Sequence, residues 1–401
     1  MMHVFLITQY FPPEVGAAAS RWGDYTEILL NKDYKVTVLC QTPNYPSGKI
    51  YKGYKKKFYY EELISNNYRI VRSGVMINNR ATSLKKILQY VSFAFSAIIN
   101  SMRIKNYDII IISSPPLFVG LVGLFLKWFK NQNYWIDIRD LWPESIASLV
   151  SGKKSIFYYF GKKLESVIYK NAYGVIMPVP GFKNYFDNHL MLNNKPKVIL
   201  KNGIAKSFLK QIESDKTEKN ELFTVIYSGN FGLAQSLNTI IKSAEMLKSY
   251  PVKFIMIGDG VSRKELIADV KIKKLKNISF HQAIDRKRLI TMIKKSSLCL
   301  VPLKKDKLFE TALPSKMFEY MACGRPVICN TGDAGKIIKN IKAGKVIEPE
   351  NPHLITDTIL YYLNNKNKVE EHGKNGYDYI KSSMIKENLL NEALSKIIHK
   401  L

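Results

Sequence analysis

The chain has 401 residues, of which 46% are hydrophobic and 23% are charged. This length is sufficient for two domains with buried cores, and the ordinary glycine and proline content excludes a disordered or fibrous protein. The formal net charge of +28 predicts an anionic partner and leaves open nucleic acid, an anionic membrane and phosphorylated substrates.

The first half of the chain alternates short apolar runs with helical patterns. The apolar runs contain few interspersed polar residues, as expected for strands that are buried on both faces of a parallel sheet. We predict a helix at 18–31 and strands at 4–8, 35–40, 107–113 and 134–138. The turn between the first strand and this helix runs from Gln9 to Gly16.

The same pattern begins again after Asn202-Gly203. Strands are predicted at 224–227, 253–257, 278–281, 298–302 and 327–330, and a final helix at 384–401. The sequence therefore predicts an α/β protein of two doubly wound, Rossmann-like domains that face a cleft. We expect an N-terminal domain at 1–202, a C-terminal domain at 203–383 and a helix at 384–401 that docks back toward the first. The polar segment Glu213 to Glu221 is predicted to be an exposed loop at the start of the second domain.

Several strand-to-helix turns contain glycine. Such turns need glycine for structural reasons, and for any single turn the structural explanation is favoured. Glycine also permits close approach of the backbone, and helix N-termini attract phosphate. Their recurrence in both halves predicts a phosphorylated ligand bound near Gly16, Gly229, Gly232, Gly258 and Gly260.

The segment from Leu313 to Ile328 is the most informative. Pro314-Ser315 reads as a helix start, which places Lys316 in the first turn, where a cation is disfavoured unless an anion is bound. Glu319 follows one turn later on the same face. A cation for a diphosphate and a carboxylate for ribose hydroxyls would suit a nucleotide-sugar, whereas the alternative is a solvated helix start with ordinary charges.

In the first half, Asp137, Arg139 and Asp140 follow a predicted strand. Arg139 could hold an anion or orient Asp140, and Asp140 could contact a sugar hydroxyl or the acceptor nucleophile. The alternative is an Asp cap with an internal ion pair. In the second half, His281 also follows a strand, where it either packs structurally or contacts a base through its backbone.

The remaining features concern the cellular compartment and the membrane. Four scattered cysteines indicate reduced thiols in a cytoplasmic protein, and Cys323 and Cys329 lack the spacing of a zinc site. Met1 to Gln9 reads as a strand rather than a signal peptide. The apolar stretch 109–129 is interrupted by Pro115-Pro116, so we predict a buried helix and no membrane span. Basic residues alternate with aromatic ones at 51–60 and 85–105, which favours an anionic lipid surface or, almost equally, a core helix with solvated lysines.

These motifs together resemble the retaining, GT-B-fold glycosyltransferases of family 4. The resemblance covers essentially the whole chain and rests on the opening loop, Lys201-Asn202-Gly203-Ile204, Gly258-Asp259-Gly260 and the segment from Leu313. The segments 10–18, 43–48 and 138–145 are similar to the branch of O-antigen and capsule L-fucosamine transferases. The resemblance implies that the first domain binds the acceptor and the second the nucleotide-sugar.

The resemblance implies two groups of site residues. Glu319 corresponds to the second family glutamate, which binds the donor ribose, but Thr311 stands where the first is expected, with Glu310 one residue away. Many relatives also carry Arg and Lys where this chain has Asn230 and Gln235, which leaves Lys316 as the best cation for the diphosphate. The predicted catalytic residues are Asp140, Arg139 and Thr311. The predicted donor-binding residues are Gly16, Gly229, Asn230, Gly258, Asp259, Gly260, His281, Pro314, Ser315, Lys316 and Glu319.

The expected activity is transfer of N-acetyl-L-fucosamine, or a related amino sugar, from a UDP-sugar. The acceptor is a polyprenyl-diphosphate-linked glycan at the inner face of the cytoplasmic membrane, in O-antigen or capsule synthesis. No Asp-x-Asp pattern lies at a plausible strand end, so we predict no metal and no cofactor. Three alternatives stay open: a GT-B-fold sugar-nucleotide epimerase, a catalytically inactive relative because of Thr311, and a basic nucleic-acid-binding protein, which no zinc-finger or ribonucleoprotein motif supports.

Overall fold

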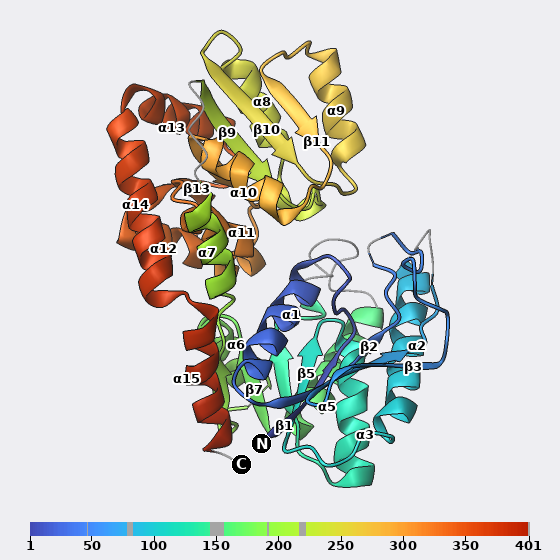
Figure 1. The fold of residues 1–401 in the computed structure, drawn as a ribbon. Coiled ribbons are helices and arrows are strands. Elements are labelled where there is room, and N and C mark those ends of the chain that lie inside the picture. The colour runs from blue at the N-terminus through green and yellow to red at the C-terminus, as the bar shows by residue number, and fades with distance from the viewer. Residues whose placement is uncertain (46, 78–82, 145–155, 191, 216–221, 400–401) are drawn as a thin grey trace. The chain divides into compact units, whose positions relative to one another are not determined.

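A computed structural model describes residues 1–45, 47–77, 83–144, 156–190, 192–215 and 222–399 (Figure 1). Pro46 and Ser145 of the sequence motifs, and most of the polar segment after Glu213, lie outside these ranges. The chain divides into two compact units, Met1–Lys201 with Leu390–Leu401 and Asn202–Leu389.

The first unit is built on an eight-stranded sheet with the order β3-β4-β2-β1-β5-β6-β7-β8. Neighbouring strands are parallel except for β3, which pairs antiparallel with β4 at the edge. Its elements are β1 (His3–Thr8), α1 (Ala17–Leu30), β2 (Lys35–Gln41), β3 (Tyr59–Ser65), β4 (Tyr68–Ser73), α2 (Ser83–Ser101), β5 (Ile109–Ser114), η1 (Leu117–Val119), α3 (Gly120–Lys130), β6 (Trp135–Ile138), α5 (Ile156–Asn171), β7 (Gly174–Met177), α6 (Phe182–Leu190) and β8 (Lys197–Ile199).

The second unit is built on a six-stranded parallel sheet with the order β11-β10-β9-β12-β13-β14. The helix α15 (Lys386–Ile398) crosses the division between the units. The other elements are α7 (Lys206–Ser214), β9 (Phe223–Ser228), η3 (Leu233–Gln235), α8 (Asn238–Met246), β10 (Val252–Ile257), α9 (Arg263–Ile272), β11 (Ile278–His281), α10 (Arg286–Lys295), β12 (Leu298–Val301), η4 (Lys307–Thr311), α11 (Ser315–Ala322), β13 (Val327–Asn330), α12 (Asp333–Ile341), β14 (Gly344–Ile347), α13 (Pro352–Asn364) and α14 (Lys366–Ser383).

The strand order positions the candidate site in each unit. β1 pairs with both β2 and β5, and β9 pairs with both β10 and β12. The order in which successive strands are added to the sheet therefore reverses beside β1 in the first unit and beside β9 in the second. In open parallel sheets, ligands bind beyond the carboxyl ends of the strands at such a switch point. The turns after β1 and β9 contain Gly16 and Gly229, respectively.

The central strands are buried along their whole length, which confirms the prediction from their apolar runs. All six residues of β1, β5 and β9 are buried. The predicted strands agree with the observed ones to within two residues at each end. The strands β3, β4, β7, β8 and β14 were not predicted. In β3, five of the seven residues are exposed, so its sequence reads as a surface segment.

The helix α3 corrects one expectation. Its glycines, Val122, Leu124 and Leu126 are buried, as predicted, but Trp128 and Phe129 at its end are 58% and 72% exposed. Among the described residues, no helix is long and apolar enough to cross a bilayer. The four cysteines are all buried, free thiols.

Candidate functional site

The carboxyl edge of the second sheet brings three of the predicted glycine positions together. A Cβ atom on Gly258 would lie 1.9 Å from the carbonyl oxygen of Gly229, and one on Gly260 would lie 2.6 Å from Asn230 Oδ1. Both glycines have positive φ angles, of 139° and 154°, which residues with side chains rarely adopt. The turns after β9 and β10 therefore pack so closely that each needs glycine for a structural reason.

These turns are also joined by backbone hydrogen bonds. Gly229 N donates to Ile257 O at 2.9 Å, and Phe231 N donates to Asp259 O at 2.8 Å. Gly258 N donates to His281 O at 3.1 Å. His281 thus contributes its backbone to the edge, whereas the side chains of Asn230 and Asp259 are exposed beside it.

Lys316 reaches this edge from α11. Pro314 is the N-cap residue of the helix and Ser315 its first residue, as the sequence predicted, so Lys316 lies in the first turn. Its Nζ atom donates to the hydroxyl of Tyr227 at 2.9 Å and lies 4.0 Å from the centre of that ring. A Cβ atom on Gly229 would come within 2.7 Å of the same Nζ atom. The ammonium group is therefore fixed over the turn after β9.

The position of Lys316 is unfavourable for a cation without an anion. Burial lowers the pKa of Lys316 to about 7, although the nearby Glu319 carboxylate acts in the opposite direction. The first turn of a helix also carries partial positive charge. An ammonium group at this place would be stabilised by a phosphate group, which supplies the negative charge that Tyr227 lacks.

Two tyrosines that the sequence analysis did not assign to the site hold these parts together. The Tyr227 hydroxyl donates to Asn230 O at 2.6 Å. The Tyr320 hydroxyl accepts from Ser228 N at 2.7 Å and so joins α11 to the end of β9. Tyr320 lies four residues after Lys316, which places both on one helical face. This four-residue spacing from Lys316 is the sequence feature from which Tyr320 could have been assigned to the site.

The remaining predicted residues of this unit are Thr311, which precedes α11, and Glu319, which lies on it. Thr311 ends η4 and is partly buried, and Glu319 is partly buried on α11. Glu310 is exposed, and its backbone packs against Gly332, where a Cβ atom would lie 2.5 Å from Glu310 O. The roles of Thr311 and Glu319 stay predictions.

In the first unit, the turn after β1 is organised by a buried carboxylate. Glu14 accepts hydrogen bonds from Gln41 Nε2 at 2.8 Å and from the backbone nitrogens of Asn44 and Tyr45 at 2.9 Å each. Burial raises the pKa of Glu14, and these hydrogen bonds oppose the increase. Gly16 is the N-cap of α1, with φ of 154°, and a Cβ atom there would lie 3.2 Å from the Tyr45 ring. Glu14 thus fixes the loop in which Gly16 lies.

Asp137 serves the structure of this unit. Its carboxylate is fully buried and accepts from Arg21 Nη2 at 2.9 Å, Trp22 Nε1 at 2.9 Å and Ser113 Oγ at 3.2 Å. Arg21 also donates to Leu200 O at 2.9 Å, so α1 is tied to β6 and to the segment after β8. Asp137 is therefore paired with Arg21, a partner that the sequence analysis did not name.

Arg139 and Asp140 follow β6 and differ in exposure. Arg139 is partly buried and donates from Nη2 to Pro115 O at 2.7 Å, while its backbone nitrogen donates to Ser114 O at 2.9 Å. Asp140 is exposed at the carboxyl edge of the sheet. Arg139 is therefore held by the Pro115-Pro116 turn, and the Asp140 side chain is accessible.

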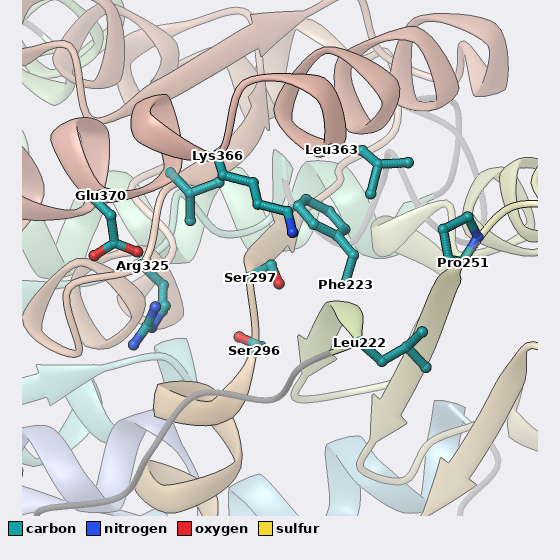
Figure 2. A pocket seen from close by; sticks show the side chains of 10 residues that line it. Leu222, Phe223, Pro251, Ser296, Ser297, Arg325, Leu363, Lys366 and Glu370 are labelled. Atoms are coloured by element: carbon teal, nitrogen blue, oxygen red, sulfur yellow. The ribbon is translucent and has the colours of Figure 1, made fainter.

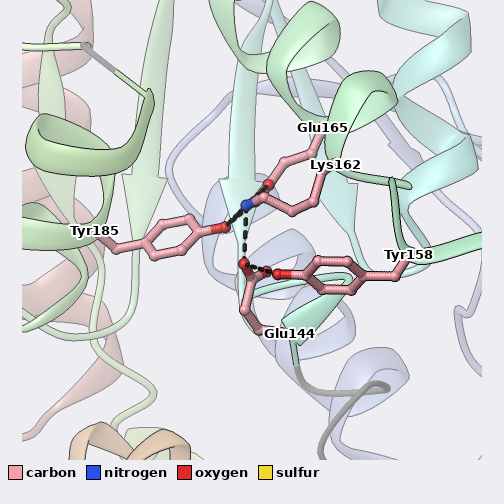
Figure 3. Close-up of polar contacts among 5 residues, drawn as sticks. All are labelled: Glu144, Tyr158, Lys162, Glu165 and Tyr185. Carbon is pink, nitrogen blue, oxygen red and sulfur yellow. Dashed lines mark hydrogen bonds and ion pairs between the residues drawn. The ribbon is translucent and has the colours of Figure 1, made fainter. Parts of the chain in front are cut away.

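A polar cluster that the sequence analysis missed fixes the segment that continues from Asp140 (Figure 3). Lys162 Nζ donates to Glu144 Oε1 at 2.9 Å and to Glu165 Oε2 at 2.6 Å. The Tyr185 hydroxyl donates to Glu165 at 2.9 Å. Glu165 is fully buried, and burial raises its pKa to about 7. The cluster joins α5, α6 and Glu144. Its residues are far apart in sequence, and Glu144, in the segment 138–145, is the one that belongs to a motif of the sequence analysis.

Comparison with known proteins identifies the class to which this architecture corresponds. Residues 210–379 match the family model of the glycosyl transferases group 1. A sucrose-phosphate synthase from Thermosynechococcus elongatus superposes with a TM-score of 0.80 at 16% identity, covering 100% of this chain and 99% of that one. The fold is therefore that of the GT-B glycosyltransferases, which confirms the predicted fold class.

Two further relatives are more specific. The putative colanic acid biosynthesis glycosyl transferase WcaI of Escherichia coli K12 is 21% identical over 403 residues, covering 96% of this chain and 97% of its own. Anabaena HepE, solved in complex with UDP, has a TM-score of 0.66 at 13% identity over 100% of both chains. Both similarities extend over nearly the whole chain, whereas the group 1 model matches residues 210–379.

Proposed function

We propose that this protein is a retaining, metal-independent glycosyltransferase of bacterial surface polysaccharide biosynthesis. It transfers N-acetyl-L-fucosamine, or a related amino sugar, from a UDP-sugar to a polyprenyl-diphosphate-linked glycan at the inner face of the cytoplasmic membrane. The similarity to a glycosyl transferase named for colanic acid biosynthesis supports the pathway, and the UDP complex of HepE supports the nucleotide. The choice of sugar follows the resemblance of segments 10–18, 43–48 and 138–145.

The observation that carries the proposal is the position of Lys316. Its ammonium group, in the first turn of α11, donates to the Tyr227 hydroxyl and lies against Gly229 in the turn after β9. When the glycosidic bond of the donor breaks, negative charge develops on the leaving diphosphate. A fixed cation and helix N-terminus stabilise this charge without reorganisation, which is the largest contribution in many enzymes. Glu319 then binds the ribose hydroxyls.

The acceptor side is proposed for the first unit. Asp140 contacts a sugar hydroxyl or the acceptor nucleophile, and Arg139, held by Pro115 O, orients Asp140 or binds an anion. Thr311 occupies the position of a family carboxylate and contacts the donor sugar through its hydroxyl instead.

The membrane surface is proposed to lie over α2, α3 and α5. Leu88, Val91 and Phe95 form an exposed stripe at helical spacing on α2, whereas Phe93 is buried and belongs to the core. α2 packs on α3 and α3 on α5, which add the exposed side chains of Trp128, Phe129, Tyr159 and Phe160. Exposed lysines flank this apolar surface at 85, 86, 130 and 163. Aromatic and basic side chains in this combination suit an anionic interface.

The donor is tested with a panel of UDP- and GDP-sugars, a lipid-diphosphate-linked monosaccharide, and EDTA. We expect UDP release and transfer with UDP-N-acetyl-L-fucosamine that persist in EDTA, and a product that keeps the anomeric configuration of the donor by NMR. Loss of transfer in EDTA would contradict metal independence, and an inverted product would contradict retention. Turnover without acceptor that interconverts two UDP-sugars would identify the epimerase instead.

Membrane binding is tested by flotation with vesicles of phosphatidylglycerol or of phosphatidylcholine. Binding should require the anionic lipid and fall in the double variant Trp128→Ser, Phe129→Ser. The matched control is Val261→Ser, Ile272→Ser, which removes two equally exposed apolar side chains of the second unit. Equal loss in both double variants would contradict the proposed surface, and tight, salt-sensitive binding to DNA or RNA without vesicle binding would favour the nucleic-acid alternative.

A further inference from the structure

A cavity lies at the opposite edge of the second sheet from Lys316. It has a volume of about 270 Å³ and is lined at the amino ends of the strands, where Phe223 begins β9, Pro251 precedes β10, Ser297 precedes β12 and Arg325 precedes β13 (Figure 2). Parallel strands place their amino and carboxyl ends at opposite edges of a sheet. The cavity is therefore separate from the turns after β9 and β10.

Arg325 is the unusual residue of this cavity. Its side chain is only 6% exposed, and among the described residues its Nε atom has no hydrogen-bond partner. Burial lowers the pKa of Arg325, and the charge of Glu370 acts in the opposite direction. A guanidinium group buried with incomplete hydrogen bonding is costly for the fold, and a buried charge is normally paired with an opposite one. The exposed Glu370 also lines the cavity, but the Nε atom of Arg325 is still without a hydrogen-bond partner among the described residues.

Two further features of the lining suit a negatively charged group. Lys366, with its exposed side chain, is the first residue of α14, an 18-residue helix, so the positive end of the helix lies at the cavity. Its N-cap, Asn365, makes no side-chain capping hydrogen bond to the helix. The apolar side chains of Phe223 and Leu363 line the same cavity (Figure 2).

We propose that this cavity binds a small organic oxyanion, a phosphate or carboxylate that carries an apolar group. The oxyanion pairs with Arg325 and Lys366, and the apolar group packs on Phe223 and Leu363. The site is independent of the donor site, because it lies at the other edge of the sheet. A ligand here would join α13 and α14 to the loop Gly324-Arg325-Pro326, which connects α11 to β13.

The test uses the full chain and four probes: phenyl phosphate, benzoate, inorganic phosphate and benzyl alcohol. Calorimetry in the presence of saturating UDP should show one binding site for phenyl phosphate, with weaker binding of phosphate and none of benzyl alcohol. Benzoate distinguishes a carboxylate ligand from a phosphate one. Binding of benzyl alcohol as tight as that of phenyl phosphate, or full competition by UDP, would overturn the proposal.

Two variants and a control locate the site. Arg325→Gln and Lys366→Ala should each weaken phenyl phosphate binding by about tenfold or more, as expected for a lost charge-assisted hydrogen bond. Arg288→Gln, which removes an exposed arginine of the same unit, should leave it unchanged. In phosphate-free buffer, Arg325→Gln should raise Tm, because a buried, incompletely paired charge is removed. Unchanged binding in both cavity variants would refute the site, and a lower Tm for Arg325→Gln would show that the arginine serves the fold.

Discussion

The carboxyl edges of the two sheets each contain a charged side chain, but the surroundings of the two side chains differ. In the first unit, Asp137 is surrounded by donors from Arg21, Trp22 and Ser113, so its charge is balanced inside the protein. In the second unit, Lys316 contacts the neutral hydroxyl and ring of Tyr227, and burial lowers its pKa to about 7. A charged residue at the carboxyl edge of a sheet is therefore not by itself a sign of function. What distinguishes the two is whether the protein supplies the counter-charge and the hydrogen bonds.

The largest effect is expected from Asp137→Ala. It leaves the Arg21 guanidinium buried without its partner, which should lower the free energy of unfolding by about 3–5 kcal/mol. Urea unfolding measures this, and Arg21→Met combined with Asp137→Leu should recover part of the loss. A loss of less than about 1 kcal/mol, which is the value for an exposed ion pair, would show that the protein does not depend on the Asp137–Arg21 pair. The proposed difference between Asp137 and Lys316 would then be wrong.

Lys316→Met should act on catalysis rather than on folding. Loss of a preorganised charge opposite the leaving group is expected to lower kcat about 100-fold or more. Tm at pH 6 should not fall, because the substitution removes a buried cation. Lys339→Met, at an exposed lysine of α12, is the matched control. Full activity of Lys316→Met would show that the diphosphate is bound elsewhere.

The third prediction concerns the pH dependence of UDP binding. In the free protein Lys316 loses its proton near pH 7, whereas a bound diphosphate would keep it protonated. UDP binding above pH 7 should therefore take up a proton, and affinity should fall about tenfold between pH 6 and pH 8. Calorimetry in buffers of different ionisation enthalpy measures the proton uptake. It should disappear in Lys316→Met, and equal uptake in that variant would assign the proton to another group.

The smallest effect is expected from Glu144→Gln. The change keeps the shape of the side chain but weakens its hydrogen bonds with Lys162, at a cost of about 1 kcal/mol of stability. Because Glu144 continues the segment of Arg139 and Asp140, kcat should fall while the KM for the donor stays unchanged. The control is Glu392→Gln, because Glu392 forms an exposed ion pair with Lys396. A change in donor KM alone would contradict a role on the acceptor side.

Much of the fold could be predicted because buried parallel strands have a simple sequence signature. β11 and β13 were predicted with the observed ends, and the helix start at Pro314-Ser315 was predicted from that residue pair. β3 could not be predicted from the same signature, since an edge strand with exposed faces lacks an apolar run.

The side-chain partners of the site were less predictable. Lys316 was assigned from its place in the first helical turn, but its contact with Tyr227 joins residues 89 positions apart. The Asp137–Arg21 pair spans 116 positions, and the sequence analysis did not name Arg21. Such contacts depend on the order of the strands in the sheet, and the local pattern of apolar and polar residues does not specify that order.

The division of the chain has a consequence for synthesis. The first unit includes Leu390, Ala393, Leu394 and Ile397, which are all buried, although the rest of that unit ends at Lys201. At the usual pace of translation, these residues leave the ribosome ~10–40 s after Lys201. The nascent first unit must therefore wait, with an apolar surface uncovered, until the whole second unit has been made. This delay is a natural window for chaperone binding, and it makes the first unit the last to finish folding.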